Sequence, residues 1–237
     1  MFDEPIYDEL VMPVDFSRPI LAIDTSTAFL SLALYQQERW LTRHIEANNQ
    51  QSAWILPLIG ELFAEAAISA VDLEAIVYAQ GPGAFTGLRI GIGVAQGLAA
   101  PFHTPLIGIP CLDAVAYGLP QHTHVLAATD ARMGEVFYAW FDTVHHQRLS
   151  DYQVGKAEAI AVLNHATAPQ GIGNVFALAS CPPIEGNPSM PTAADYLKLA
   201  LTQRYPAVAA AQAELLYVRN KIALTAKEQA ERKATLC

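Results

Sequence analysis

The residues best suited to chemistry stand in two short polar turns, one in each half of the chain. Asp24-Thr25-Ser26-Thr27 follows the apolar run ILAI, and Asp130 with Arg132 follows the apolar run VLAAT. In a protein of two facing lobes, acids and hydroxyls in such turns hold phosphate and hydrated magnesium. The same residue types also form turns in which side chains only satisfy nearby backbone groups. We favour this local role, because no phosphate-binding lysine or glycine pair flanks Asp24.

Metal ligands and catalytic nucleophiles lack the spacing that their chemistry needs. The seven histidines include no His-x-x-x-His pair, and the closest groupings are His122-x-His124 and His145-His146. No Gly-x-Ser-x-Gly elbow is present, and the three cysteines have no recognisable partner. The sequence therefore predicts no metal site, no catalytic residue and no tightly bound cofactor. We expect at most weak binding of ATP or ADP with Mg²⁺ at the turn residues Asp24, Thr25, Ser26, Asp130 and Arg132.

The glycine-rich stretch GPGAFTGLRIGIGVAQGLA, residues 81–99, looks at first like a phosphate-binding loop. Its glycine spacing fits neither the dinucleotide fingerprint nor the P-loop, which also needs a lysine after its last glycine. Read as a helix from about Thr86, it has glycines on two flanks, each costing about 1 kcal/mol relative to alanine. Gly87 and Gly91 share one flank with Val94 and Leu98, Gly93 and Gly97 share the other with Ile90, and Arg89 and Gln96 form a polar edge. Small residues on two flanks predict a helix squeezed between its own sheet and another helix.

A second helix is expected over residues 52–67, with a wide apolar stripe at helical spacing. Together the helices at 52–67 and 86–100 carry more apolar surface than one sheet face can cover, so a protein partner would cover the rest. The alternative, that both helices pack inside one large lobe, is equally compatible with the composition. The candidate partner-binding residues are Ile55, Leu56, Ile59, Leu62, Phe63, Gly87, Arg89, Ile90, Gly91 and Val94.

The composition is that of a globular protein with a well-buried core. The chain has 237 residues, of which 52% are hydrophobic and 16% charged, and its net charge is -9. Such an acidic chain does not hold nucleic acid by itself, because lysine and arginine supply most of that affinity. The sequence shows no signal peptide and no membrane-spanning stretch, which predicts a cytoplasmic protein. Residues 1–18 are rich in acids and form an N-terminal extension, for which two readings stay open: a disordered segment or the product of an upstream start codon.

Two similar runs of elements predict a duplicated α/β fold. Residues 20–46 indicate three antiparallel strands, followed by the helix at 52–67, a buried strand at 74–80, the second helix and a strand at 105–109. This βββαβα order is typical of a ribonuclease-H-like lobe. A similar run begins at residue 123, with a helix near 156–165, a strand near 171 and a helix at 192–203. We therefore predict a first lobe at 19–104, a second at 105–213, five-stranded mixed sheets, and a tail at 214–237 that can pack back on the first lobe.

Several segments together resemble the TsaB family, formerly YeaZ. They are ILAIDTST, YAQGPGAFTGLRIGIGVAQGLA, PLIGIPCLDAVA, TDARMGEVFYA and AELLYVRNKIAL, and the likeness runs from Ile20 to Leu224. The resemblance implies the two-lobed fold of the actin-like ATPase superfamily. It also implies a role in making N6-threonylcarbamoyladenosine at adenosine 37 of tRNA, as an inactive paralogue of the transferase TsaD.

The resemblance implies how such a subunit works. It would pair with TsaD through the two helices of its first lobe, in a bundle that a homodimer can mimic, while TsaE and ATP act on the pair and tRNA binds only through the complex. The chain would then be a non-catalytic subunit without membrane contact. The alternatives are an independent weak ATPase of the actin-like class, a glycoprotease-like enzyme, or a purely structural homodimer, and fold alone confers none of these.

Overall fold

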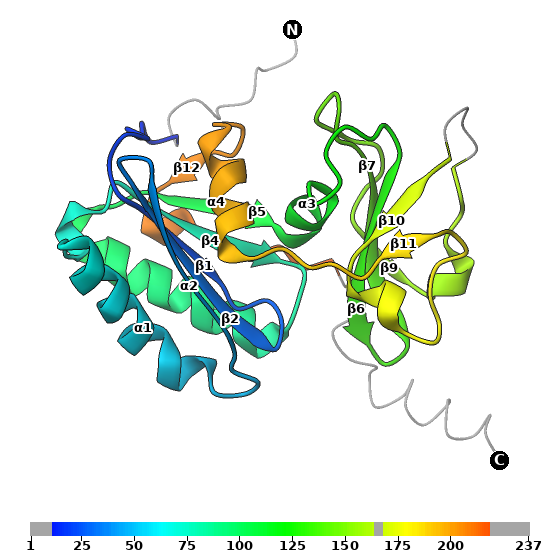
Figure 1. The fold of residues 1–237 in the computed structure, drawn as a ribbon, viewed down its shortest axis with the longest axis horizontal. Helices are drawn as coiled ribbons and strands as arrows, with labels where there is room; N and C mark the ends of the chain where they lie inside the picture. Colours follow the sequence, from blue (N-terminus) through cyan, green and yellow to red (C-terminus); the bar gives the residue numbers. More distant parts are fainter. Residues whose placement is uncertain (1–10, 164–167, 219–237) are drawn as a thin grey trace, which may run out of the picture.

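The computed structural model describes residues 11–163 and 168–218, which form two α/β lobes that meet at α3 (Cys111–Ala116) (Figure 1). Each lobe is built on a mixed sheet. The first sheet has the strand order β12-β5-β4-β1-β2-β3, and the second has the order β11-β10-β6-β7-β8 with β9 beside β7. In both, antiparallel neighbours flank the central strand on one side and a parallel neighbour flanks it on the other. The prediction of two ribonuclease-H-like lobes is confirmed, although each sheet has six strands rather than five.

The first sheet is buried on both faces at its centre. Its strands are β1 (Ile20–Asp24), β2 (Phe29–Gln36), β3 (Arg39–Glu46), β4 (Ala75–Gly81), β5 (Leu106–Pro110) and β12 (Ala207–Val208). Successive residues of a strand point to opposite faces. Leu21 and Ile23 accordingly join one core cluster, and Ile20 and Ala22 join another. The apolar run of β1 therefore supplies two cores at once.

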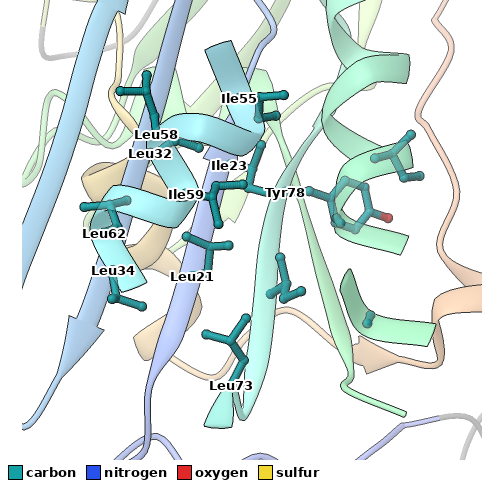
Figure 2. Close-up of a cluster of buried hydrophobic side chains, with 14 of the residues drawn as sticks. Leu21, Ile23, Leu32, Leu34, Ile55, Leu58, Ile59, Leu62, Leu73 and Tyr78 are labelled. Atoms are coloured by element: carbon teal, nitrogen blue, oxygen red, sulfur yellow. The ribbon is translucent and has the colours of Figure 1, made fainter. Parts of the chain in front are cut away.

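Helices cover the two faces of this sheet. Helices α1 (Gln51–Ala66) and α2 (Phe85–Ala99) lie side by side on one face, and α4 (Ala193–Leu201) packs on the other (Figure 1). Figure 2 shows Ile55, Ile59 and Leu62 of α1 pointing toward the strands, where they meet Leu21 and Ile23. The predicted helices at 52–67 and 86–100 are thus confirmed to within one residue at each end.

The second lobe repeats the first sheet with shorter strands and fewer helices. Its strands are β6 (Val125–Arg132), β7 (Glu135–Asp142), β8 (Gln147–Arg148), β9 (Gln153–Gly155), β10 (Gln170–Ile172) and β11 (Gly186–Asn187). The described residues also form five short 3-10 helices, η1 (Ala70–Asp72), η2 (Ala100–Phe102), η3 (Ala157–Ala159), η4 (Asn174–Ala177) and η5 (Ala210–Gln212). Of the helix predicted at 156–165, only η3 forms within residues 156–163, and residues 164–165 lie outside the described residues.

The predicted boundary between the lobes is wrong. Strand β5 pairs in parallel with β4, so it belongs to the first sheet and not to a second lobe starting at residue 105. The chain also returns to the first lobe before residue 213, because α4 packs on β1 and β2 and β12 pairs with β5. Parallel pairing joins strands that are distant in sequence, so the order of elements along the chain did not locate this boundary.

The segments next to the two ends pack on the first lobe. Met12 donates a backbone hydrogen bond of 2.8 Å to Ala207, and Met12, Val14 and Phe16 contact the core cluster under α4. Disorder of the extension is therefore wrong for residues 11–18, while residues 1–10 lie outside the described part. At the other end, Leu216 donates 2.8 Å to the carbonyl of Gln80, so the predicted return of the tail holds for its described residues, 214–218.

Candidate partner-binding surface

Helix α1 has an inward face that builds the core and an outward face that nothing in the lobe covers. Ile55 is 1% exposed, whereas Leu56, the next residue, is 56% exposed. Ala53, Pro57 and Gly60 are exposed with it, at the three- and four-residue spacing of one helical face. This face is apolar and small, and Trp54 lies at its edge with 47% of its surface exposed.

The glycines of α2 separate into a packed pair and an open pair. A Cβ on Gly87 would overlap the carbonyl oxygen of Thr25, and one on Gly91 would overlap the Thr25 hydroxyl. The hydroxyl of Thr25 in turn donates a 2.7 Å hydrogen bond to the carbonyl of Gly87. By contrast, a Cβ on Gly93 or Gly97 would meet nothing within 4 Å. The packed pair lets α2 approach the turn after β1, and the open pair faces outward.

We define the open helix face as Ala53, Leu56, Pro57 and Gly60 of α1 with Gly93 and Gly97 of α2. Gly60 resembles the open pair, because its Cβ would also have no neighbour within 4 Å. α1 and α2 lie side by side (Figure 1), so their outward residues form one surface.

An aromatic cluster stands at the N-terminal end of α2. The guanidinium of Arg89 lies 3.6 Å from the ring centre of Phe85, and the ring of Tyr217 lies 6.3 Å from that of Phe85. Phe85 is 54% exposed and Tyr217 is 52% exposed. Aromatic and arginine side chains of this kind contribute most of the binding energy in many protein interfaces.

The structure corrects half of the predicted partner-binding residues. Ile55, Ile59, Leu62, Gly87 and Gly91 are buried inside the lobe and are not accessible to a partner. Leu56 and Arg89 are exposed, and Phe63, Ile90 and Val94 are half-buried beside the core. The sequence pattern placed Gly93 and Gly97 on a separate flank of the helix, but neither was among the predicted partner-binding residues. The exposed residues Ala53, Pro57 and Gly60 were not predicted to bind a partner either.

The two polar turns have the same local structure in both lobes. The backbone N–H of Ser26 donates to Oδ1 of Asp24 at 2.8 Å, and that of Arg132 donates to Oδ1 of Asp130 at 2.8 Å. These are turns in which an acidic side chain accepts from the backbone two residues later. The two lobes therefore share this turn hydrogen bond as well as the pattern of strand pairing in their sheets.

The surroundings of the two turns differ. Asp24, Thr25 and Ser26 are buried, at 4%, 1% and 6% exposure, and burial raises the pKa of Asp24 despite its hydrogen bonds from Ser26. Asp130 and Arg132 lie nearer the surface, with 3.5 Å between Oδ2 and Nη1. The two carboxylates therefore have different surroundings: Asp24 accepts from Ser26 in a buried turn, whereas Asp130 lies beside the guanidinium of Arg132. Weak nucleotide binding at these five residues stays a prediction.

Asp24 is near two other buried polar groups, the thiol of Cys111 and the hydroxyl of Tyr196, and its charge acts on both. The negative charge of Asp24 and, above all, burial raise the pKa of the Cys111 thiol to about 12 and that of Tyr196 well above its usual value. The hydroxyl of Tyr196 has no hydrogen-bond partner among the described residues. A thiol with so high a pKa is a poor nucleophile at neutral pH.

Comparison with known proteins decides the family. The family model of TsaD, tRNA N6-adenosine threonylcarbamoyltransferase, matches residues 45–227. The solved structure of YeaZ from Pseudomonas aeruginosa superposes with a TM-score of 0.76 at 32% identity, covering 84% of this chain and 99% of that one. The chain belongs to the TsaB (YeaZ) family. The predicted resemblance is confirmed over most of both chains.

Curated TsaB relatives agree with this family assignment. The tRNA threonylcarbamoyladenosine biosynthesis protein TsaB of Escherichia coli K12 is 44% identical over 124 residues, which are 51% of this chain and 53% of the relative. TsaB of Haemophilus influenzae is 40% identical over 124 residues, or 51% of this chain and 52% of the relative. The aligned region therefore spans about half the length of these curated relatives.

In residues 11–163 and 168–218, no group of three or more His, Cys, Asp or Glu residues is placed to hold a metal ion. Within the same ranges, no helix has the length and apolar character to cross a membrane.

Proposed function

We propose that this chain is a non-catalytic subunit in the formation of threonylcarbamoyladenosine at adenosine 37 of tRNA, acting in the cytoplasm by pairing with a TsaD-type transferase through its open helix face. Support comes from membership of the TsaB family and from the name of the E. coli relative, a tRNA threonylcarbamoyladenosine biosynthesis protein. The acidic chain would meet tRNA only within the complex, because its net charge of -9 disfavours binding phosphates alone.

One observation carries the pairing proposal, namely the three open glycines. A glycine inside a helix costs about 1 kcal/mol relative to alanine. Close packing against Thr25 explains Gly87 and Gly91, but no contact within the lobe explains Gly60, Gly93 or Gly97. Glycines on an exposed helix face allow another backbone to approach closely, so a partner helix packed on this face would explain all three.

The surroundings of the open helix face indicate the type of partner. Leu56, Trp54 and Phe85 are large apolar side chains exposed near small residues, which fits an apolar helix pair better than a charged ligand. A TsaD-type subunit and a second copy of this chain both belong to the family matched here, and either could present such a pair. We propose the heterodimer as the working form, with TsaE and ATP acting on it.

The test is a charge placed on the open helix face. Leu56→Glu should leave the chain folded, because Leu56 is 56% exposed, and it should weaken pairing with TsaD by more than tenfold because a buried unpaired charge is costly. Val71→Glu is the matched control, since Val71 is also 56% exposed but lies in η1, outside the open helix face. Binding is measured by calorimetry with TsaD, and function by threonylcarbamoyl transfer to tRNA with each subunit left out in turn.

The outcomes separate this function from its alternatives. If Leu56→Glu pairs with TsaD as tightly as Val71→Glu does, the open helix face is not the interface. If the chain alone hydrolyses ATP or peptide at a rate that exceeds its buffer control, the non-catalytic assignment fails. Ile59→Glu is not a useful interface variant, because Ile59 is 2% exposed and its replacement should unfold the lobe.

A further inference from the structure

A pocket at the junction of the lobes combines basic and aromatic side chains in an otherwise acidic protein. It lies where α3, the turn between β7 and β8, and the segment after α4 come together. Its volume is about 170 Å³. The residues that carry the argument are Asp113, Tyr117, His146, Arg148, Arg204 and Tyr205.

Its two arginines have no acidic partner at ion-pair distance. Among the described residues, no carboxylate oxygen lies within 4.0 Å of the Arg148 or Arg204 guanidinium. Both lie beside tyrosine side chains. The guanidinium of Arg148 lies 4.0 Å from the ring centre of Tyr152. The charge of Arg204 acts on Tyr117, whose pKa is raised by burial and lowered in part by this arginine. Each guanidinium carries five N–H donors, and no ion pair between described residues occupies them.

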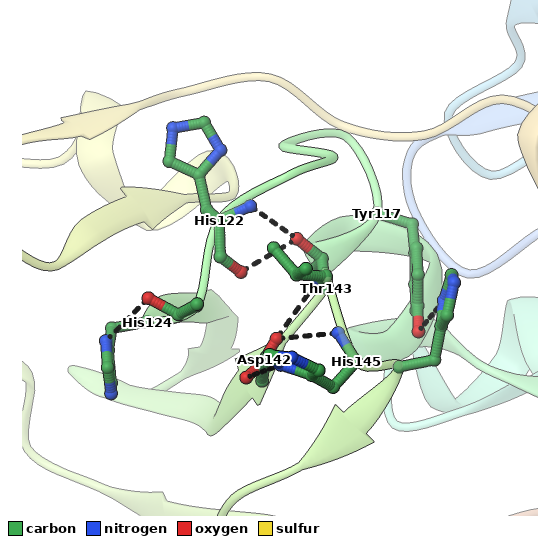
Figure 3. Close-up of polar contacts among 9 residues, drawn as sticks. Tyr117, His122, His124, Asp142, Thr143 and His145 are labelled. Atoms are coloured by element: carbon green, nitrogen blue, oxygen red, sulfur yellow. Dashed lines mark hydrogen bonds and ion pairs between the residues drawn. The ribbon is translucent and has the colours of Figure 1, made fainter.

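The two acidic side chains near the pocket, Asp113 and Asp142, already accept hydrogen bonds from other groups. Asp113 accepts a 2.5 Å hydrogen bond from Tyr152 and a 3.0 Å hydrogen bond from Tyr205, one on each oxygen, and burial raises its pKa. Asp142 accepts from the backbone of Val144 and His145 and lies 2.7 Å from the imidazole of His145 (Figure 3). Arg148 and Asp113 interact electrostatically, because the arginine charge lowers the pKa of Asp113 against the larger effect of burial. Among the described residues, however, neither Asp113 nor Asp142 reaches Arg148 or Arg204 at ion-pair distance.

His146 adds a further donor. Its Nδ1 lies 2.9 Å from the Tyr117 hydroxyl, and the two rings stack 5.4 Å apart. Burial and the nearby charge of Arg204 lower the pKa of His146, which favours the neutral imidazole. In the tautomer whose Nδ1 accepts from the Tyr117 hydroxyl, the proton lies on Nε2, which can then donate a hydrogen bond to an anion.

We propose that this pocket is a binding site for a phosphate group, held between Arg148 of the second lobe and Arg204 of the first. Arginine recognises phosphate through paired N–H donors, and the pocket presents two such groups with a neutral histidine beside them. Its volume is smaller than that of pockets that enclose a whole drug-sized ligand, which favours a phosphate over an entire nucleotide. A bound phosphate would link the two lobes directly. This site is independent of the open helix face.

Calorimetry on the full chain tests the site with three probes. Inorganic phosphate, AMP and a trinucleotide RNA are each titrated into the parent protein, Arg148→Gln and Arg204→Gln. Each variant should weaken phosphate binding about tenfold, the effect of losing one charge-assisted contact. Arg39→Gln is the control for the change in net charge, because Arg39 lies on β3 and pairs with Glu65, away from the pocket. It should bind within about twofold of the parent.

The probes also identify the source of the phosphate. Tighter binding of AMP than of phosphate assigns the site to mononucleotides, and still tighter binding of the trinucleotide assigns it to the RNA backbone. Arg204→Lys keeps the charge but removes the paired donors, so it should also bind more weakly than the parent. The proposal is overturned if no probe binds, or if the pocket variants bind as the Arg39→Gln control does. Circular dichroism establishes beforehand that each variant is folded.

Discussion

At the residue scale, Thr25 and the two packed glycines, Gly87 and Gly91, form a close contact between α2 and the turn after β1. Gly87→Ala should destabilise the protein by about 1–3 kcal/mol, because a Cβ there would overlap the Thr25 carbonyl and force α2 away from β1. Gly93→Ala, six residues along the same helix, meets nothing within 4 Å and should stabilise the isolated chain by up to about 1 kcal/mol. Urea unfolding of both variants measures the difference. Equal effects of the same sign would show that α2 does not pack on Thr25 as described.

This junction also shows where sequence reasoning reaches its limit. Helical periodicity correctly placed Gly87 with Gly91 and Gly93 with Gly97 on two flanks. It could not tell which flank meets the sheet, because glycine has no side chain whose polarity would distinguish inside from outside. The buried pair was consequently assigned to the partner and the exposed pair was not. Only the position of Thr25 across the lobe resolves the choice.

The buried carboxyl of Asp24 gives a pH-dependent prediction. Burial raises the pKa of Asp24 in the folded state above the ordinary value of 3.8. The stability that Asp24 contributes to the folded protein is therefore fully present below pH 3.8, and it is lost as the pH rises through the folded-state pKa. Asp24→Asn stays neutral and keeps an oxygen for the Ser26 N–H, so its stability relative to the parent should increase as the pH rises from about 4 to 7. Asp24→Ala, which removes that oxygen, should be less stable than Asp24→Asn at both pH values in urea unfolding. A stability difference between Asp24→Asn and the parent that does not change with pH would contradict this account.

At the element scale, α4 is attached to the sheet through its first turn. The buried backbone N–H of Ala193 donates a 2.9 Å hydrogen bond to the hydroxyl of Ser31 on β2, while Thr192 and Asp195 form a capping box. Ser31→Ala should cost about 1–3 kcal/mol, because it leaves that buried N–H without an acceptor. Ser52→Ala is a suitable control, since Ser52 is exposed near the start of α1, where no side-chain cap is formed. Thermal unfolding compares them, and similar small losses would mean that Ser31 does not anchor α4.

Local elements were predicted far better than their assignment to lobes. The strands at 20–24, 29–36 and 39–46 were readable because their apolar residues are grouped or alternate and turns separate them. The failures concern distant pairing, as in β5, and the helix at 156–165, where apolar spacing is present but only η3 forms. A short amphipathic segment becomes a helix mainly through tertiary packing, which the sequence pattern does not contain.

At the scale of the whole molecule, Asp113 connects the two lobes. It lies on α3, and its two oxygens accept from Tyr152 of the second lobe and Tyr205 of the first. Among the described residues, the three longest helices, α1, α2 and α4, belong to the first lobe, so helical circular dichroism reports mainly on that lobe. Trp140, which is 3% exposed on β7, reports on the second. The molecule thus contains separate probes for its two halves.

These probes allow a test of whether the lobes unfold together. In a background of Trp40→Phe and Trp54→Phe, which leaves Trp140 as the one tryptophan of the sequence, the fluorescence and dichroism transitions in urea should coincide. Tyr152→Phe and Tyr205→Phe should each cost about 1–3 kcal/mol, and their combined cost should differ from the sum by at least about 0.5 kcal/mol, because both act on one carboxyl. We expect the double variant to separate the two transitions. Strictly additive losses with coincident transitions would show that Asp113 satisfies each tyrosine locally and does not couple the lobes.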